Sequence, residues 1–252
     1  GLYRSIKEIG GLMMNCTEIL MAKDKMEEEC GVFGIYSKEV NEVAQITYYG
    51  LYALQHRGQE SAGISVSNFG EIVTYKGMGL TADVFTPETL NNLVGNAAIG
   101  HVRYSTTGAS KLENAQPLES RYKLGQIAVA HNGNLTNAKI IRELLEDAGS
   151  TFNTSIDSEV IIKMIARKAN GNVEDAIRST VGAIKGAYAL VILAGNKLVG
   201  VRDPYGIRPL CLGINENGDY ILASESCAID AVGGTLIRDV LPGEMVIIDE
   251  NG

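Results

Sequence analysis

The sequence predicts an α+β fold in which antiparallel sheets are covered by helices. Three observations favour this class. Apolar residues make up 45% of the 252-residue chain and charged residues 21%, which is typical of a globular domain. Glycine is frequent, with 29 residues, and proline is scarce, with 5, as expected for short strands joined by tight turns. Helical patterns come in blocks, between stretches of strand and hairpin patterns.

The first half of the chain is predicted to form strands around one helix. Apolar side chains at residues 44, 48, 51 and 54 have helical spacing and predict a helix over 42–54. Two strand patterns, 63–67 and 71–76, flank Asn68-Phe69-Gly70 and predict a hairpin. Three further strands are expected at 32–36, 97–103 and 126–131.

The second half is predicted to contain three helices followed by hairpins. The helix over 137–148 places Ile140, Ile141, Leu144, Leu145 and Ala148 on one face. The helix over 158–169 is apolar over a wider arc, which predicts burial on two sides, and a third helix covers 173–184. Turn signals at residues 195–196 and 217–218 predict two hairpins. The expected strands are 187–193, 197–202, 210–214, 220–223 and 244–249.

Charge and cysteine usage exclude several classes of function. Lys plus Arg is 22 and Asp plus Glu is 30, a net charge of −8 without a basic run, which disfavours nucleic-acid binding. The longest apolar run, 187–194, is too short to cross a membrane, and residues 1–29 lack a signal-peptide core. Cysteines at 16, 30, 211 and 227 show no metal-binding spacing. We therefore expect a cytoplasmic protein with reduced thiols, Cys16 and Cys211 being structural or incidental.

Four residues stand out as candidates for chemistry. His56, His101 and His131 are the three histidines, and each lies in a polar stretch containing glycine. Taken singly, such a stretch is more often a hydrogen-bonded turn, and a cysteine such as Cys30 is more often a small buried apolar residue. Together they favour a nucleophilic site. Cys30 can be activated by a histidine, or by its own α-amine if the chain is cut before it, because that amine titrates near pH 7.7–8.0.

Eight motifs stand out along the chain. Five are CGVFG (30–34), LQHRGQESAG (54–63), GHVRYST (100–106), HNGNL (131–135) and DSE (157–159), and three others are YYGL (48–51), RDPYGIRPL (202–210) and ASESCA (223–228). The first five resemble, in the same order, those of class II glutamine amidotransferases, which are N-terminal-nucleophile hydrolases. Three others resemble the branch of that family that aminates phosphoribosyl pyrophosphate, the first committed step of purine synthesis. The resemblance extends from about residue 29 to the last residue. It implies a four-layer αββα sandwich with two antiparallel sheets.

The resemblance implies a mechanism for Cys30. Its thiolate would attack the side-chain amide of glutamine and form a glutamyl thioester, which water hydrolyses after ammonia has left. The side-chain amide of Asn132 and the backbone N–H of Gly133 would form the oxyanion hole. The ammonia would convert phosphoribosyl pyrophosphate to 5-phosphoribosylamine.

The resemblance also implies a pocket for glutamine. Arg103 would bind its α-carboxylate and Asp157 its α-ammonium group, with Thr106 in the same pocket wall. Arg57 and Gly58 are expected beside Cys30, where Arg57 would position a closing loop. Taken without the resemblance, Asp157 is equally a helix N-cap and Arg103 a surface ion-pair partner.

The division of the chain follows from the same resemblance. We expect residues 1–29 to be a leader that must be removed to free the amine of Cys30, and 30–252 to be the glutaminase domain. Met21 or Met26 could instead be the true start. We expect the phosphoribosyltransferase domain of this branch to be absent from the 252-residue chain. Hydrolysis of glutamine requires no cofactor, whereas a [4Fe–4S] cluster, with Cys227 as a ligand, and Mg²⁺ are implied only for a full-length enzyme, which is expected to be a homotetramer.

Two alternatives remain open on the sequence. The ammonia acceptor could be different, as in glucosamine-6-phosphate synthase or asparagine synthetase, although the motif at 54–63 and Cys227 weigh against this. Alternatively, a chain that keeps its leader would be an inactive precursor acting as an interaction or regulatory module.

Overall fold

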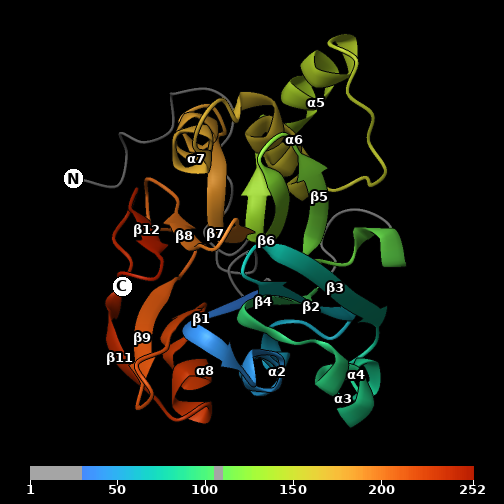
Figure 1. The fold of residues 1–252 in the computed structure, drawn as a ribbon. Helices are drawn as coiled ribbons and strands as arrows, with labels where there is room; N and C mark the ends of the chain where they lie inside the picture. The colour runs from blue at the N-terminus through green and yellow to red at the C-terminus, as the bar shows by residue number, and fades with distance from the viewer. Residues whose placement is uncertain (1–29, 105–109) are drawn as a thin grey trace, which may run out of the picture.

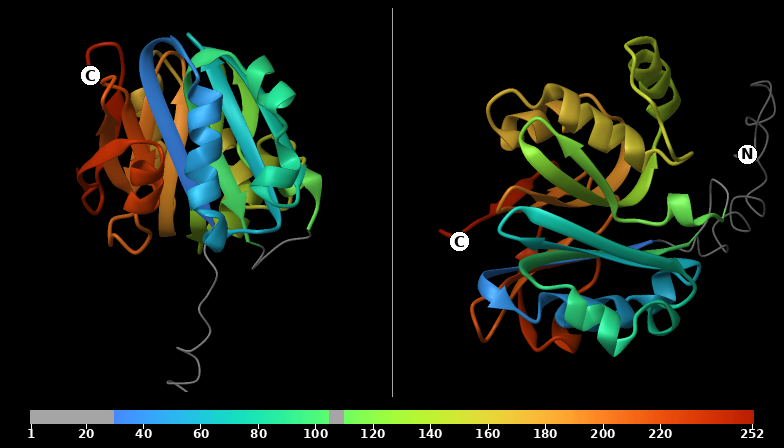
Figure 2. Two further views of the ribbon diagram at one scale, coloured as in Figure 1. Left: turned by 90° about the horizontal axis from the view of Figure 1, so that it is seen from below. Right: turned by 45° about the vertical axis from the view of Figure 1, so that its right-hand side comes forward.

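The computed structural model describes residues 30–104 and 110–252. Two antiparallel sheets lie face to face, and helices cover the outer side of each sheet (Figures 1 and 2). The predicted α+β class and the αββα layer order are therefore confirmed.

Seven strands form the larger sheet and five form the smaller one. In spatial order, the larger sheet contains β11 (Gly234–Asp239), β9 (Cys211–Asn215), β10 (Tyr220–Ala223), β1 (Gly31–Asn41), β4 (Gly95–Arg103), β2 (Ser61–Asn68) and β3 (Glu71–Met78). The smaller sheet contains β12 (Met245–Ile248), β8 (Leu198–Arg202), β7 (Gly186–Ala194), β6 (Gly125–Leu135) and β5 (Leu118–Tyr122).

The helices form the two outer layers, as Figure 1 shows. The larger sheet is covered by α2 (Val43–Ala53), α3 (Thr81–Val84), α4 (Pro87–Asn92) and α8 (Ser226–Ala231). The smaller sheet is covered by α5 (Ala138–Asp147), α6 (Ser158–Lys168) and α7 (Val173–Val181). Two single 3₁₀ turns, η1 (Gln55–Arg57) and η2 (Leu112–Asn114), lie in the connections. No helix of the described part of the chain is long and apolar enough to span a bilayer.

Alternation along the central strands produces three apolar layers. Val32 faces the other sheet and contributes to the central layer, whereas Phe33, the next residue, packs under α2. In the smaller sheet, Ala128 joins the central layer and Ile127 packs against α6. Successive side chains of a strand point to opposite faces, so strands that are apolar on both faces must lie between layers.

The turns and helices agree with the sequence predictions, with one exception. Phe69 and Gly70 both have positive φ, of 48° and 105°, as a two-residue hairpin turn requires. The helix α6 is buried on two sides as predicted. The predicted apolar face of α5 is only partly used, because Ile140 and Leu144 are 62% and 63% exposed. The helix itself forms as predicted, but Leu145 is its one buried residue because α5 projects away from the sheet (Figure 1).

Candidate active site

Two strands, one from each sheet, bring the predicted motifs together. Cys30 immediately precedes β1, and the register pairs Gly31 with Val102 on β4, so Cys30 lies beside the end of β4 at Arg103. The Nε2 atom of His101, on the same strand, lies 3.0 Å from the carbonyl oxygen of His131 on β6. Strand β6 continues into Asn132 and Gly133. The candidate nucleophile and the candidate oxyanion donors therefore lie at the same end of the two stacked sheets.

The thiol of Cys30 is held at the edge of the interior. Its Sγ atom lies 3.6 Å from the carbonyl oxygen of Tyr104. Burial raises the pKa of the thiol, and the Tyr104 backbone and the guanidinium groups of Arg103, Arg208 and Arg57 only partly oppose this. The thiol is therefore protonated at neutral pH, and a nucleophilic role requires a base to accept its proton.

Arg57 connects the backbone of Cys30 to an acidic residue far along the chain. It lies in η1, is buried, and donates from Nε to the carbonyl oxygen of Cys30 at 3.1 Å. Its second contact is an ion pair with Glu225, whose other carboxylate oxygen lies 2.9 Å from His56 Nε2. Burial would raise the pKa of Glu225, but the hydrogen bonds from Arg57 and His56 hold it below its ordinary value. Glu225 thus stays ionised and anchors the arginine that contacts Cys30.

Gly58, which follows Arg57, is required by close packing. A Cβ atom at this position would lie 2.7 Å from the carbonyl carbons of Val102 and Arg103. The loop after α2 can therefore lie directly against the end of β4, where it places Arg57 beside Cys30.

Asn132 carries a buried amide without a partner. Its side chain is 1% exposed, and its Nδ2 atom makes no hydrogen bond to any described residue. Buried polar groups are nearly always hydrogen-bonded, so an orphaned donor suggests a function. An N–H group that is unpaired in the free protein is available to an incoming oxyanion.

The backbone N–H of Gly133 points away from β7. Tyr188 lies opposite Gly133 where β6 pairs with β7. The N–H of Tyr188 donates to the Asp203 carboxylate and its carbonyl oxygen accepts from the N–H of Asp203. Gly133 and Tyr188 are therefore a pair without mutual hydrogen bonds. The glycine itself is demanded by packing, because φ is 133° and a Cβ atom would lie 2.0 Å from the carbonyl oxygen of Ala187. Close packing against β7 thus requires a glycine at position 133.

Arg103 forms a buried ion pair rather than a surface one. Its NH1 atom lies 3.0 Å from Oε1 of Glu60, and the two side chains are 5% and 14% exposed. The backbone N–H of Glu60 also donates to the carbonyl oxygen of Arg103 at 3.0 Å. Glu60 therefore contacts both the guanidinium and the backbone carbonyl of Arg103.

Asp157 occupies the N-cap position of α6 but does not cap the helix. Its carboxylate makes no cap hydrogen bond and instead accepts from the N–H of Leu135 at 2.7 Å, with Oδ1 3.5 Å from His131 Nδ1. Burial would raise the pKa of Asp157, but the His131 ring and the Leu135 N–H lower it below its ordinary value. The structure therefore replaces the capping alternative with an anion that connects α6 to the end of β6. Thr106 lies outside the described residues.

The two buried histidines hold strands together. His101 is completely buried and donates its Nε2–H to the carbonyl oxygen of His131, while Gln116 Oε1 accepts from the N–H of His131 at 2.8 Å. His131 Nδ1 lies 3.0 Å from Ser158 Oγ. Burial lowers the pKa of His101 to about 3, so its imidazole is neutral at physiological pH. His101 therefore serves as a neutral donor that connects the two sheets next to Asn132.

The burial of His101 predicts a pH-dependent stability. An unfolded chain protonates this imidazole below about pH 6.5, whereas the folded chain leaves it neutral down to about pH 3. The unfolded state thus binds more protons in this window, and the free energy of unfolding falls with decreasing pH by up to about 1.4 kcal/mol per pH unit. We expect denaturant titrations between pH 7 and pH 5 to show a smaller slope for His101→Gln than for the parent chain. Because the carboxylates titrate in both proteins, equal slopes would contradict this account of His101.

The motif at 202–210 forms a loop that is stabilised from inside. Asp203 is fully buried, and Arg202 donates to carbonyl oxygens on the other side of the same loop. The loop places Arg208 where its charge lowers the pKa of the Cys30 thiol. The carboxylate of Asp203 accepts from the backbone N–H groups of Tyr188, Tyr205, Ile207 and Arg208.

Cys227 does not belong to a metal site in the described structure. The residue is exposed on α8, and its Sγ atom lies 3.5 Å from a carboxylate oxygen of Glu225. Partial burial of the thiol and the neighbouring Glu225 carboxylate raise the pKa of the thiol. Within residues 30–104 and 110–252, no group of three or more His, Cys, Asp or Glu side chains could hold a metal ion. The donors needed for a four-ligand iron–sulfur cluster are therefore not assembled among these residues.

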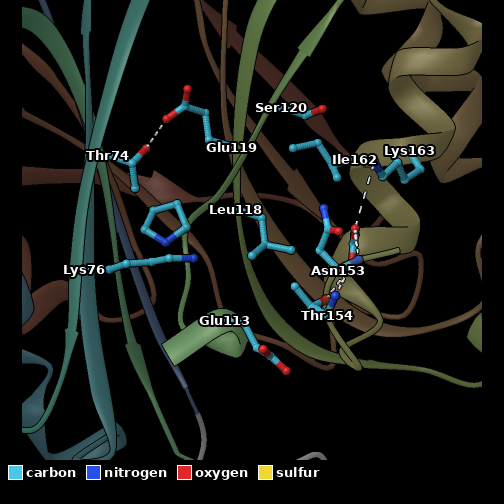
Figure 3. Close-up of a pocket in the computed structure, with 12 residues that line it drawn as sticks. Thr74, Lys76, Glu113, Leu118, Glu119, Ser120, Asn153, Thr154, Ile162 and Lys163 are labelled. Atoms are coloured by element: carbon cyan, nitrogen blue, oxygen red, sulfur yellow. Dashed lines mark hydrogen bonds and ion pairs between the residues drawn. The ribbon is translucent and has the colours of Figure 1, made fainter. Parts of the chain in front are cut away.

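A polar pocket of about 420 Å³ lies elsewhere, between the two sheets at the β3 and β5 edges and next to α6 (Figure 3). Lys76 and Glu119 line one side, Asn153 and Lys163 the other, and none of the predicted site residues contributes to it. The candidate active site is thus identified by its chemistry and not by this pocket.

Sequence analysis missed the partners of the site residues. Glu60 and Glu225 lie inside motifs that were recognised, but they received no role, and Gln116 and Arg208 were not singled out. The available signal was that Glu60 and Glu225 occur in recognised motifs, and that basic residues such as Arg57 and Arg103 occur in the same or another of these motifs. A sequence alone does not show which acid meets which arginine across 43 or 168 residues.

Comparisons with known proteins agree with this chemistry. A family model described as glutamine amidotransferase domain matches residues 101–231. The chain is 47% identical over 228 residues to amidophosphoribosyltransferase 3, chloroplastic, of Arabidopsis thaliana, covering 90% of this chain and 42% of the relative. It is 46% identical over 228 residues to the amidophosphoribosyltransferase of Bacillus subtilis, covering 90% and 47%. The chain thus spans about half the length of the curated relatives it matches.

A solved structure supports the same relationship. The chain matches the structure described as the allosteric regulatory enzyme of purine biosynthesis with a TM-score of 0.84 and 46% identity. The match covers 88% of this chain and 48% of that one. Fold and sequence therefore agree over nearly the whole of the described part.

Proposed function

Because the chain belongs to the glutamine amidotransferase domain family, we propose that it hydrolyses the side-chain amide of glutamine with Cys30 as the nucleophile. The observation that carries this proposal is the buried Nδ2 atom of Asn132, which has no hydrogen-bond partner among residues 30–104 and 110–252 and lies at the end of the sheets where Cys30 lies. Other buried side-chain atoms of the described residues also lack a partner, among them Thr81 Oγ1 and Thr180 Oγ1. What distinguishes the Asn132 donor is its place at the end of the sheets where Cys30 lies, where an N–H group could stabilise a transient anion.

The proposed first step forms a thioester and releases ammonia. The Cys30 Sγ atom attacks the amide carbon while the α-amine of the same residue accepts the thiol proton and passes it to the departing nitrogen. The developing oxyanion accepts hydrogen bonds from Asn132 Nδ2 and the N–H of Gly133. Water then attacks the thioester, the thiol is restored, and glutamate leaves. This step needs a free amine, so we propose that residues 1–29 are removed.

Arg103 and Asp157 are proposed to bind the α-carboxylate and the α-ammonium group of glutamine. The low pKa of Asp157 keeps an anion available for the ammonium group. The guanidinium of Arg103 lies near the Cys30 thiol, since its charge lowers the thiol pKa. A planar guanidinium suits a carboxylate because it can donate two parallel hydrogen bonds.

The acceptor of the ammonia is a separate proposal. The curated relatives are amidophosphoribosyltransferases more than twice the length of the matched part. We propose phosphoribosyl pyrophosphate as the acceptor, bound by a phosphoribosyltransferase domain like the part of the relatives that this chain does not match. The Mg²⁺, the [4Fe–4S] cluster and the tetramer expected for such an enzyme remain predictions.

The test is an intact mass measurement after exposure to a diazoketone analogue of glutamine. We expect the loss of residues 1–29 and one adduct on Cys30, together with ammonia release from glutamine in the untreated protein. If the chain is neither cut nor labelled, the measurement is repeated with a second protein that begins at Cys30. If that protein is folded and remains unlabelled, the glutaminase proposal fails and the interaction-module alternative is favoured.

A further inference from the structure

The ion pair between Glu60 and Arg103 fixes a cation at the candidate site. Both side chains are largely buried, with NH1 3.0 Å from the carboxylate oxygen. The backbone of Glu60 is fixed as well, since its N–H donates to the Arg103 carbonyl at 3.0 Å and its own carbonyl accepts from Gly79 at 2.8 Å. Glu60 precedes β2, which pairs with β4 so that Ser61 lies opposite Arg103. Two anchors on one acidic residue thus define where the guanidinium lies.

We infer that Glu60 is a positioning residue that gives the site its preference for substrates with an α-carboxylate. The inference rests on the proposed function, in which Arg103 binds that carboxylate. A free arginine side chain has many rotamers, and ordering it during substrate binding weakens affinity. A guanidinium already held by Glu60 has lost this freedom on folding, so the substrate carboxylate meets a fixed donor.

The charge of Glu60 has an opposite effect that must be separated from its geometry. A carboxylate beside Arg103 partly neutralises the guanidinium and repels a second carboxylate. If this effect dominated, removing the charge would strengthen glutamine binding. Glu60→Gln keeps an acceptor oxygen for Arg103 NH1 but removes the charge, whereas Glu60→Leu removes both. The two substitutions therefore distinguish positioning from competition.

The experiment compares L-glutamine with 4-aminobutanamide, which is glutamine without its α-carboxylate. For Glu60→Leu we expect KM for glutamine to rise about 10-fold while kcat changes less than about 3-fold, since Arg103 contacts no reacting atom. With 4-aminobutanamide, kcat/KM should change less than about 3-fold, which also shows that the variant is folded. Glu60→Gln should raise KM for glutamine less than about 3-fold. Inhibition constants of L-glutamate and 4-aminobutanoate provide the same comparison without turnover.

Glu225→Gln is the matched control, because it removes the carboxylate partner of another buried arginine, Arg57. Arg57 contacts the backbone of Cys30, so this variant should affect both substrates equally. Equal losses on both substrates for Glu60→Leu would mean that Glu60 is merely structural, and a lower KM in both Glu60 variants would mean competition. Either result overturns the inference while leaving the proposed function intact. Absence of glutamine hydrolysis by the parent protein would instead remove the proposed function and the inference with it.

Discussion

Replacing Cys30 by alanine is expected to lower kcat for glutamine hydrolysis by at least about 10⁴-fold, because no other group in the proposed mechanism can form the thioester. The fold should survive, since Cys30 lies at the edge of the sheet and the contact of its Sγ atom with the described residues is a long one, 3.6 Å to the Tyr104 carbonyl oxygen. The measurement is ammonia release from glutamine, with a denaturant titration to show that the free energy of unfolding changes by less than about 1 kcal/mol. Residual activity above about 1% of the parent would contradict the role of Cys30.

The α-amine can be separated from the thiol in a second pair of proteins. One begins at Cys30 and the other carries a single additional alanine before it. Burial raises the pKa of the thiol, so it needs a base at neutral pH. A general base contributes about 10²–10⁴-fold to rate. The extended protein should lose this factor while keeping the same fold. Equal rates would point to a different base, and His101 is a poor candidate because burial lowers the pKa of its imidazole to about 3.

The sequence predicted the strands that lie between layers and two of the four edge strands, β3 and β12, but missed the other two. Strands such as β1 and β4 show long apolar patterns because both faces are buried. All four edge strands bury at most one side chain, so no alternation is imposed on their sequences. The strand β3 was predicted because a hairpin turn precedes it, whereas β5 and β11 have no such signal and were not predicted. The short helices α3, α4 and α8 were also missed, because four to six residues are too few to establish a helical period.

The site could be predicted as a set of motifs but not as a set of contacts. Cys30, Asn132 and Arg103 were recognised from local sequence and from their order along the chain. Their partners depend on pairing between strands that are distant in sequence: Glu60 meets Arg103 because β2 pairs with β4. Asp157 is a second example, in which a local pattern suggested the wrong partner. Its position before a helix suggested a cap, whereas its carboxylate accepts from Leu135 at the end of β6.

Asn132→Leu is expected to separate catalysis from stability. Loss of one oxyanion donor typically lowers kcat by about 10²–10³-fold, and KM should change less than about 3-fold because the α-groups of glutamine are bound elsewhere. The Nδ2 atom of Asn132 is buried without a partner in the described structure. An apolar side chain of similar size removes a desolvation penalty of about 1–3 kcal/mol. The variant should therefore be at least as stable as the parent in a denaturant titration.

Asn96→Leu provides the opposite case on β4. Asn96 is also fully buried, but its amide is satisfied, because Oδ1 accepts from Phe69 N at 2.9 Å and Nδ2 donates to Ser37 at 3.1 Å and to Asn196 at 3.0 Å. Its substitution should cost about 2–4 kcal/mol of stability and leave kcat within about 3-fold. If Asn132→Leu were destabilised to a similar extent, its amide would be a structural group. The unpartnered donor would then no longer support an oxyanion hole. An Asn132→Leu protein that is less active but as stable as the parent would mean that the fold keeps this donor unsatisfied for the reaction.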